Sequence, residues 1–293
     1  ILSTLNPEPG TLNPEPRTLN MNLPTTFRFW LLLVLAVLVF PAEVMAEARF
    51  NGVRERLYRD GFEAGWIETI YSRDGVFFDL RSAVSYFRHR EAALNYDQFT
   101  DPDSIEKARA YLEKHEQALS RAEENYGVDR SIVTAILLVE TRLGTYVGRR
   151  STLSILSSLA ALQESWVRDA AWTEMEKTPQ LSRDRFDAWA KNKSGWAYRE
   201  LKAFLTYTDR EDLDPASVMG SYAGALGIAQ FMPTSILDYA ADGNDDGQVN
   251  LFHHEDAIAS VAKYLKKNGW QEQMDRDQQA KVVYRYNHSE YYV

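Results

Sequence analysis

The chain has 293 residues, no cysteine and a formal net charge of −9. A surplus of acidic residues disfavours binding to nucleic acid or to anionic membrane surfaces. Without cysteine no disulfide can stabilise the fold, which must therefore be held by its core.

The first 46 residues differ in composition from the rest and are not expected to join the folded domain. Residues 1–20 repeat the Pro-rich words TLNPEPG and TLNPEPR, which cannot build a core, so we interpret them as a low-complexity segment upstream of a start at Met21. Residues 21–46 are typical of a cleaved secretory signal peptide, because Arg28 precedes the apolar run FWLLLVLAVLVF and the small-residue site VMA ends at Ala46. A membrane anchor is the alternative, since the apolar run is only slightly short for a span. Cleavage predicts a periplasmic protein, and because no cysteine follows the signal the protein is not expected to be a lipoprotein.

Helical patterns dominate residues 47–293, which we interpret as one mainly α domain. Apolar positions spaced by three and four predict a first long helix over 103–126. Asp103 and Glu106 have the spacing of a capping box at its start. His115 falls on the buried face of this helix and is interpreted as a packed side chain.

A second helix is predicted after a cap at Asp129 or Ser131, and its last turn carries Glu140. Glu140 stands three and four residues after Leu137 and Ile136, so it emerges from the apolar face. A charged glutamate on such a face costs free energy unless it is paired or neutralised. It could be one half of a structural ion pair, a metal ligand, or an acid that keeps its proton because a reaction needs it.

Residues 164–215 are rich in tryptophan and charge and are predicted to form helices and loops. No strand run is long enough for a parallel sheet, and no P-loop, dinucleotide fingerprint or nucleophile elbow occurs. The segment GSYAGALGIAQFMPTS, residues 220–235, has three glycines before an apolar cluster and a helix predicted to start near Thr234. It is either a close-packed turn or a backbone that approaches a ligand, with Gln230 presenting its amide.

The segment DGNDDGQVN begins like an EF-hand calcium loop. Asp242, Asn244 and Asp246 occupy positions 1, 3 and 5, and a glycine follows at position 6. Position 12 is His253 where an EF-hand has glutamate, so the loop would have to be longer than usual. A solvated turn rich in Asp and Asn is the alternative. A helix is predicted after it, over about 255–268.

Four motifs, VETRLG, GSYAGALGIAQFMPTS, DGNDDGQVNLFHHEDAIASVAKYLKKNGW and YNHSEYY, together resemble the membrane-bound lytic murein transglycosylase B family. The similarity runs from roughly Tyr96 to the last residue. It implies a lysozyme-like catalytic core over about 126–293, with helical elaboration and an EF-hand-like loop over 242–256. It also implies that Glu140 is the only catalytic carboxylate.

The resemblance further implies a set of binding residues. The implied substrate-binding residues are Ser221, Gln230, Phe231, Tyr264, Tyr286, Asn287 and Tyr292. The implied ligands of a structural calcium ion are Asp242, Asn244, Asp246, the Gln248 carbonyl and Asp256. No organic cofactor is expected.

The sequence also departs from the family pattern. Leu143 replaces a tryptophan found in many relatives, the segment 164–190 looks inserted, and Trp196 is matched to an aromatic substrate contact. The family usually adds a short final helix beyond the position of Val293.

The implied activity is cleavage of the β-1,4 bond between N-acetylmuramic acid (MurNAc) and N-acetylglucosamine in peptidoglycan, leaving a 1,6-anhydro sugar end. Glu140 would act first as acid and then as base, and burial that raises its pKa would suit the first role. A hydrolase of goose-type lysozyme character on the same fold is the first alternative. A non-catalytic, calcium-stabilised wall-binding module is the second. The expected partners are peptidoglycan glycan strands and other cell-wall enzymes, with no nucleic acid, and the protein is expected to be a monomer.

Overall fold

The computed structural model describes residues 49–79, 95–175, 182–287, 289 and 292. The described residues belong to one compact unit. The predicted low-complexity segment and signal peptide lie outside the described residues. No helix in the described ranges combines the length and apolar character needed to cross a membrane.

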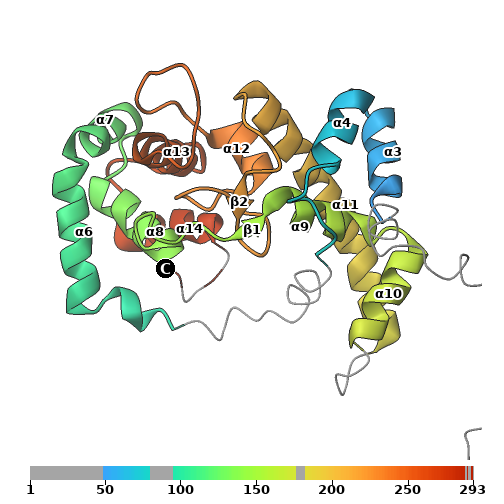
Figure 1. Ribbon diagram of the computed structural model, residues 1–293. Coiled ribbons are helices and arrows are strands. Elements are labelled where there is room, and N and C mark those ends of the chain that lie inside the picture. Colours follow the sequence, from blue (N-terminus) through green and yellow to red (C-terminus); the bar gives the residue numbers. More distant parts are fainter. Residues whose placement is uncertain (1–48, 80–94, 176–181, 288, 290–291, 293) are drawn as a thin grey trace, which may run out of the picture. The chain divides into compact units, whose positions relative to one another are not determined.

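The described residues are mainly helical, as predicted, and Figure 1 labels the elements. A small antiparallel sheet pairs β1 (Arg150–Ser151) with β2 (Met219–Gly220). The helices, in chain order, are α3 (Asn51–Arg59), α4 (Ala64–Tyr71), the 3-10 turn η2 (Asp97–Phe99), α6 (Pro102–Lys114), α7 (Glu116–Tyr126), α8 (Arg130–Thr141), α9 (Thr152–Ala161), α10 (Ser165–Met175), α11 (Arg183–Arg210), α12 (Pro233–Tyr239), α13 (His254–Lys267) and α14 (Arg276–Tyr286).

Two groups of helices pack on either side of the small sheet. In one group α6, α7, α8 and α13 contact one another and α14 contacts α13; in the other α3 and α11 pack on α9, with α4 against α3 and α10 against α11. Helix α12 contacts both α11 and α13 and so joins the groups. Figure 1 shows β1 and β2 in the centre, between α8 and α9.

The core is centred on α9, which is buried along its whole length against α11. Its leucines Leu153, Leu156 and Leu159 have no exposed surface. Complete burial of such a side chain contributes about 1.5–3 kcal/mol to the free energy of unfolding. This rigid centre carries β1 directly before it and thereby supports the site described below.

The helix predicted over 103–126 is wrong in two respects. The segment forms two helices, because the backbone of His115 leaves the helical region (φ −111°, ψ 24°). His115 is the C-cap residue of α6 and the N-cap residue of α7. The predicted capping box of Asp103 and Glu106 does not form. Asp101 is the cap, accepting a hydrogen bond from the Ser104 N–H at 2.7 Å. The helix starts earlier than predicted because Pro102 has its φ preset for the first helical position.

The other helix boundaries are close to prediction. Asp129, one of the two predicted caps, accepts from the Ser131 N–H at 2.7 Å at the start of α8. Helix α12 begins at Pro233, one residue before the predicted start, again because proline suits the first position. The ring of His115 packs against Tyr111, as the interpretation of a packed side chain requires.

Candidate active site

Glu140 lies at the end of α8, where the chain turns sharply. The next residues leave the helix through a left-handed conformation at Arg142 (φ 51°). The Thr141 hydroxyl donates to the Ile228 carbonyl at 2.8 Å and accepts from the Gly144 N–H at 2.9 Å. The end of α8 is therefore fixed to the segment 220–235, which carries several of the predicted binding residues.

The segment 220–235 is closely packed, as the first of the two interpretations predicts, and its residues Ser221 and Gln230 also line the cavity described below. A Cβ atom added to Gly227 (φ 68°) would lie 2.5 Å from the Leu251 Cβ atom. A Cβ atom on Gly148 (φ 95°), across the sheet, would lie 2.0 Å from the Gly220 carbonyl oxygen. Only glycine fits these positions, since both need a positive φ and leave no room for a side chain.

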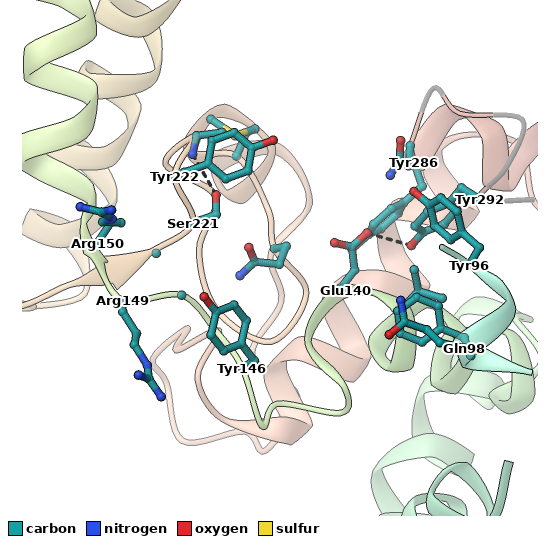
Figure 2. Close-up of a pocket in the computed structure, with 18 residues that line it drawn as sticks. Tyr96, Gln98, Glu140, Tyr146, Arg149, Arg150, Ser221, Tyr222, Tyr286 and Tyr292 are labelled. Carbon is teal, nitrogen blue, oxygen red and sulfur yellow. Dashed lines mark hydrogen bonds between the residues drawn. The ribbon is translucent and has the colours of Figure 1, made fainter. Parts of the chain in front are cut away.

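A cavity of about 1120 Å³ opens beside this turn (Figure 2). Glu140 is the only acidic residue among the described residues that line it. The described residues that line it are Tyr96, Gln98, Phe99, Val139, Glu140, Tyr146, Gly148, Arg149, Arg150, Gly220, Ser221, Tyr222, Ala223, Gln230, Met232, Tyr286, Asn287 and Tyr292. It thus contains five of the seven predicted substrate-binding residues together with Glu140.

Glu140 is half-buried and lies against tyrosines. The Tyr292 hydroxyl donates a hydrogen bond to its Oε1 atom at 2.8 Å. The rings of Tyr286 and Tyr292 stack with centroids 6.3 Å apart, and Tyr96 meets Tyr292 edge-on at 6.2 Å. Burial, reinforced by the nearby charge of Glu140, raises the pKa of Tyr286 and of Tyr292 well above the usual range. Tyr292 therefore remains a neutral hydroxyl that can donate at any physiological pH.

Two of the predicted binding residues also fix the turn. The Ser221 hydroxyl oxygen accepts from the Ala225 N–H at 3.0 Å. The Gln230 amide nitrogen donates to the Gly227 carbonyl at 2.8 Å and to the Val147 carbonyl at 3.3 Å. Gln230 itself has a positive φ of 48°. Its side chain thus lines the cavity and links two segments of the backbone.

Phe231 and Tyr264 do not belong to the cavity lining, although the resemblance implies that they bind substrate. Phe231 is only 3% exposed, and the Tyr264 hydroxyl donates to the Arg285 carbonyl at 2.6 Å. Their rings lie 5.9 and 5.0 Å from the ring of Tyr286. Both residues are therefore placed to support Tyr286 from behind.

Several lining residues were not predicted from the sequence. Gln98 and Phe99 lie in η2 and Tyr96 directly precedes it, more than 40 residues before Glu140, where no periodic pattern indicated a site. Gln98 is held by the Arg142 guanidinium, which donates to its Oε1 atom at 2.6 Å. Tyr146, Arg149 and Arg150 follow the VETRLG motif directly, and this proximity is the signal that could have identified them.

Two family departures also lie outside the lining. Leu143 and Trp196 are partly buried and pack against the hydrophobic core. The Lys193 ammonium lies 3.5 Å from the centroid of the Trp196 ring, and burial lowers the pKa of Lys193 to about 8. Trp196 thus has a partner within the protein and is not placed at the described cavity.

The predicted calcium loop closes on the buried carboxylate of Asp256, which has no exposed surface. Its two oxygens accept from the Gly243 N–H at 2.8 Å and the Asn250 N–H at 2.7 Å. Burial raises the pKa of Asp256, and the negative charges of Asp242 and Asp246 raise it further, against these two hydrogen bonds. A bound cation would therefore stabilise the ionised carboxylate of Asp256.

Two other acidic side chains of the loop accept hydrogen bonds from groups within the loop. Asp242 accepts from the Gly247 N–H at 2.8 Å, and Asp246 accepts from the Gln248 N–H at 2.8 Å and from the Asn244 amide at 2.8 Å. In the described ranges no group of three or more acidic or histidine side chains is placed to hold a metal ion. The hard oxygen donors nevertheless fit calcium by their chemistry. The calcium site remains a prediction.

A helical domain with one half-buried glutamate and several tyrosines in a large cavity has the features expected of an enzyme that acts on sugar chains. The Transglycosylase SLT domain family model matches residues 46–283, and the chain belongs to this family. The family resemblance drawn from the four motifs is thereby confirmed. The match ends before Tyr286, Asn287 and Tyr292, which complete the cavity.

Individual relatives agree with this assignment. The membrane-bound lytic murein transglycosylase B of Escherichia coli (strain K12) is 36% identical over 173 residues, which are 59% of this chain and 40% of that protein. The matched part of the chain thus spans less than half the length of that relative.

Two solved structures share the fold. Soluble lytic transglycosylase SltB1 from Pseudomonas aeruginosa superposes with a TM-score of 0.66 at 24% identity, covering 84% of this chain and 94% of that one. The Escherichia coli lytic transglycosylase Slt35 in complex with calcium gives a TM-score of 0.66 at 24% identity, covering 83% and 88%. At this identity the two structures establish a mainly helical, lysozyme-like fold.

Proposed function

We propose that this protein is a lytic transglycosylase that cleaves the MurNAc–N-acetylglucosamine β-1,4 bond of peptidoglycan and leaves a 1,6-anhydro-MurNAc end. The observation that carries the proposal is the single acidic side chain of the described cavity lining, Glu140, held by the Tyr292 hydroxyl at 2.8 Å. Membership of the transglycosylase family and 36% identity to a murein transglycosylase support it.

Glu140 acts twice in this reaction. In the first step its proton moves to the glycosidic oxygen, the bond from that oxygen to the anomeric carbon breaks, and the sugar becomes cation-like. The acetamido group of the same MurNAc stabilises the developing charge. In the second step the 6-hydroxyl oxygen of that sugar bonds to the anomeric carbon and its proton returns to Glu140. Tyr292 orients the carboxyl group throughout, and no water is consumed.

The scarcity of acidic groups favours this route over ordinary hydrolysis. Glycosidases commonly use two carboxylates roughly 5–10 Å apart, the second serving as nucleophile or base. The described lining offers no second acid beside Glu140. The substrate's own acetamido and 6-hydroxyl groups can replace that second group. A hydrolase of goose-type lysozyme character would use the same cavity and is the second candidate.

Mass spectrometry of the products distinguishes these reactions. We expect purified peptidoglycan sacculi digested by the protein to release fragments with 1,6-anhydro ends, each lighter by one water than a hydrolysis product. Fragments that carry the added water would identify a hydrolase. Release of no fragments, with binding retained, would identify a non-catalytic wall-binding module. Size-exclusion chromatography of the same preparation tests the expected monomer.

The proposed calcium ion would be bound by Asp242, Asn244, Asp246, the Gln248 carbonyl and Asp256. Three observations support it: hard oxygen donors at alternate positions, a sharp glycine turn at Gly247 with φ 87°, and the buried Asp256 beside two further negative charges. Slt35, which shares the fold, was solved in complex with calcium. The proposed role is structural, because the mechanism above needs no metal.

Export is proposed from the sequence of residues 21–46. A positive residue, a compact apolar run and a small-residue site are the three parts of a secretory signal peptide. We expect N-terminal sequencing of protein recovered from the periplasm to begin at or near Glu47. Recovery of residues 1–20 in the mature protein would contradict both the proposed start and the proposed cleavage.

A further inference from the structure

Two adjacent arginines form a positively charged end of the cavity, at a distance from Glu140. Arg150 lies on β1, where it pairs with Gly220, the residue before Ser221. Figure 2 shows Arg149 and Arg150 at one side of the view, with Tyr146 and Ser221 between them and Glu140. The two arginines are the only cationic residues in the described lining.

The surrounding described residues pair with only one of the two arginines. Arg150 has one partner, Asp79, whose Oδ2 atom is 3.4 Å from its Nη1 atom, and its side chain remains 55% exposed. Arg149 is exposed and makes no hydrogen bond or ion pair in the part of the chain that the structure describes. Both guanidinium groups are exposed at this end of the cavity, where their positive charge can attract an anion.

The negative charges of the proposed substrate lie on its peptide stems. Its sugar rings are neutral, whereas the peptide stems attached to MurNAc carry free carboxylates. A guanidinium group binds a carboxylate through two parallel N–H donors, a geometry that suits arginine better than lysine. The cavity of about 1120 Å³ also exceeds the roughly 300–1,000 Å³ of ordinary small-molecule sites, so it has room beyond a single sugar.

We propose that Arg149 and Arg150 bind a carboxylate of the peptide stem and make the protein select strands that still carry charged stems. The inference rests on the proposed function, since it names the part of the same substrate that this end of the cavity recognises. The tyrosines around Glu140 would bind the sugar, and the arginines would bind the peptide stem that is attached to the same sugar.

The test compares two forms of soluble, uncrosslinked peptidoglycan strands: native strands, and strands whose stem carboxylates have been converted to amides. We expect the protein to act faster on native strands. Because exposed ion pairs are weak, Arg149→Ala and Arg150→Ala should each lower the native-to-amidated rate ratio by roughly three- to fivefold. The effect should appear mainly in KM, since the groups lie away from the reacting bond. Arg185→Ala on α11, also an exposed arginine but outside the cavity, is the matched control and should leave the ratio unchanged.

A binding measurement separates this proposal from the proposed reaction. Glu140→Gln protein should bind native strands more tightly than amidated strands, and added salt should reduce that difference because the contact is ionic. Equal binding of both strands, or a preference that survives replacement of both arginines, would overturn the inference even if the enzyme is active. Preferential binding with no anhydro product from wild-type protein would retain the stem site and refute the lytic reaction.

Discussion

Glu140→Gln is expected to lower the rate of 1,6-anhydro product release by at least roughly 10²–10⁴-fold, the usual contribution of general acid–base catalysis. The amide keeps the size of the side chain and an oxygen that can accept from Tyr292, but it cannot give up and recover a proton. The wild-type and variant rates on sacculi, measured by product mass spectrometry, provide the test.

The fold should survive this substitution. Glu140 is half-buried at the end of α8, and the anchor of that helix end is the neighbouring Thr141, whose hydroxyl bonds to the Ile228 carbonyl. Glu124→Gln, the same change at an exposed position of α7, serves as the matched control and should keep full activity. Near wild-type turnover by Glu140→Gln would refute the catalytic assignment. Loss of folding in that variant alone would instead support a structural ion pair.

Removal of calcium is expected to lower the melting temperature without an immediate effect on turnover. A ligand that binds only the folded state, at 100 times its dissociation constant, adds about 2.7 kcal/mol to the free energy of unfolding. For a domain of this size that corresponds to roughly 5–11 °C. Differential scanning calorimetry in chelator and in excess calcium measures the difference.

Variants of the loop locate the effect. Asp246→Ala should abolish the calcium-dependent shift, because it removes one predicted ligand. Asp245→Asn is the matched control: it removes a charge from the same loop at a position outside the predicted ligand set, and asparagine tolerates the positive φ of 61° found there. Equal melting curves with and without calcium would refute the site. Prompt loss of turnover in protein that remains folded without calcium would assign the metal a catalytic role.

The sequence by itself predicted the local features of this protein well. The 3.6-residue spacing of apolar side chains indicated the helices, and the position of Glu140 on the apolar side of α8 singled out one carboxylate. The four motifs identified the family, because their order and spacing along the chain can be read from the sequence without the structure. These features depend on residues that are neighbours in sequence, where periodicity and capping rules apply.

Apolar periodicity gave a wrong prediction for the segment 103–126, whose two halves pack against different helices. The stripe of apolar residues continues past His115, so periodicity predicted a single helix where α6 and α7 form. Helix α6 packs mainly on α8, whereas α7 packs mainly on α13. The chain breaks at His115 because the two halves bury their apolar faces against different partners, and one of these partners, α13, is distant in sequence.

The cavity was decided only by the tertiary structure. It brings η2, the end of α8, β1, the segment 220–235 and the end of α14 together, and no local pattern indicates that these segments meet. The same packing places Phe231 and Tyr264 behind Tyr286 and leaves the side chains of Arg149 and Arg150 exposed at the opposite end. A family motif can identify residues of a site, but whether a side chain faces the cavity or supports a neighbour depends on long-range contacts between segments far apart in the chain.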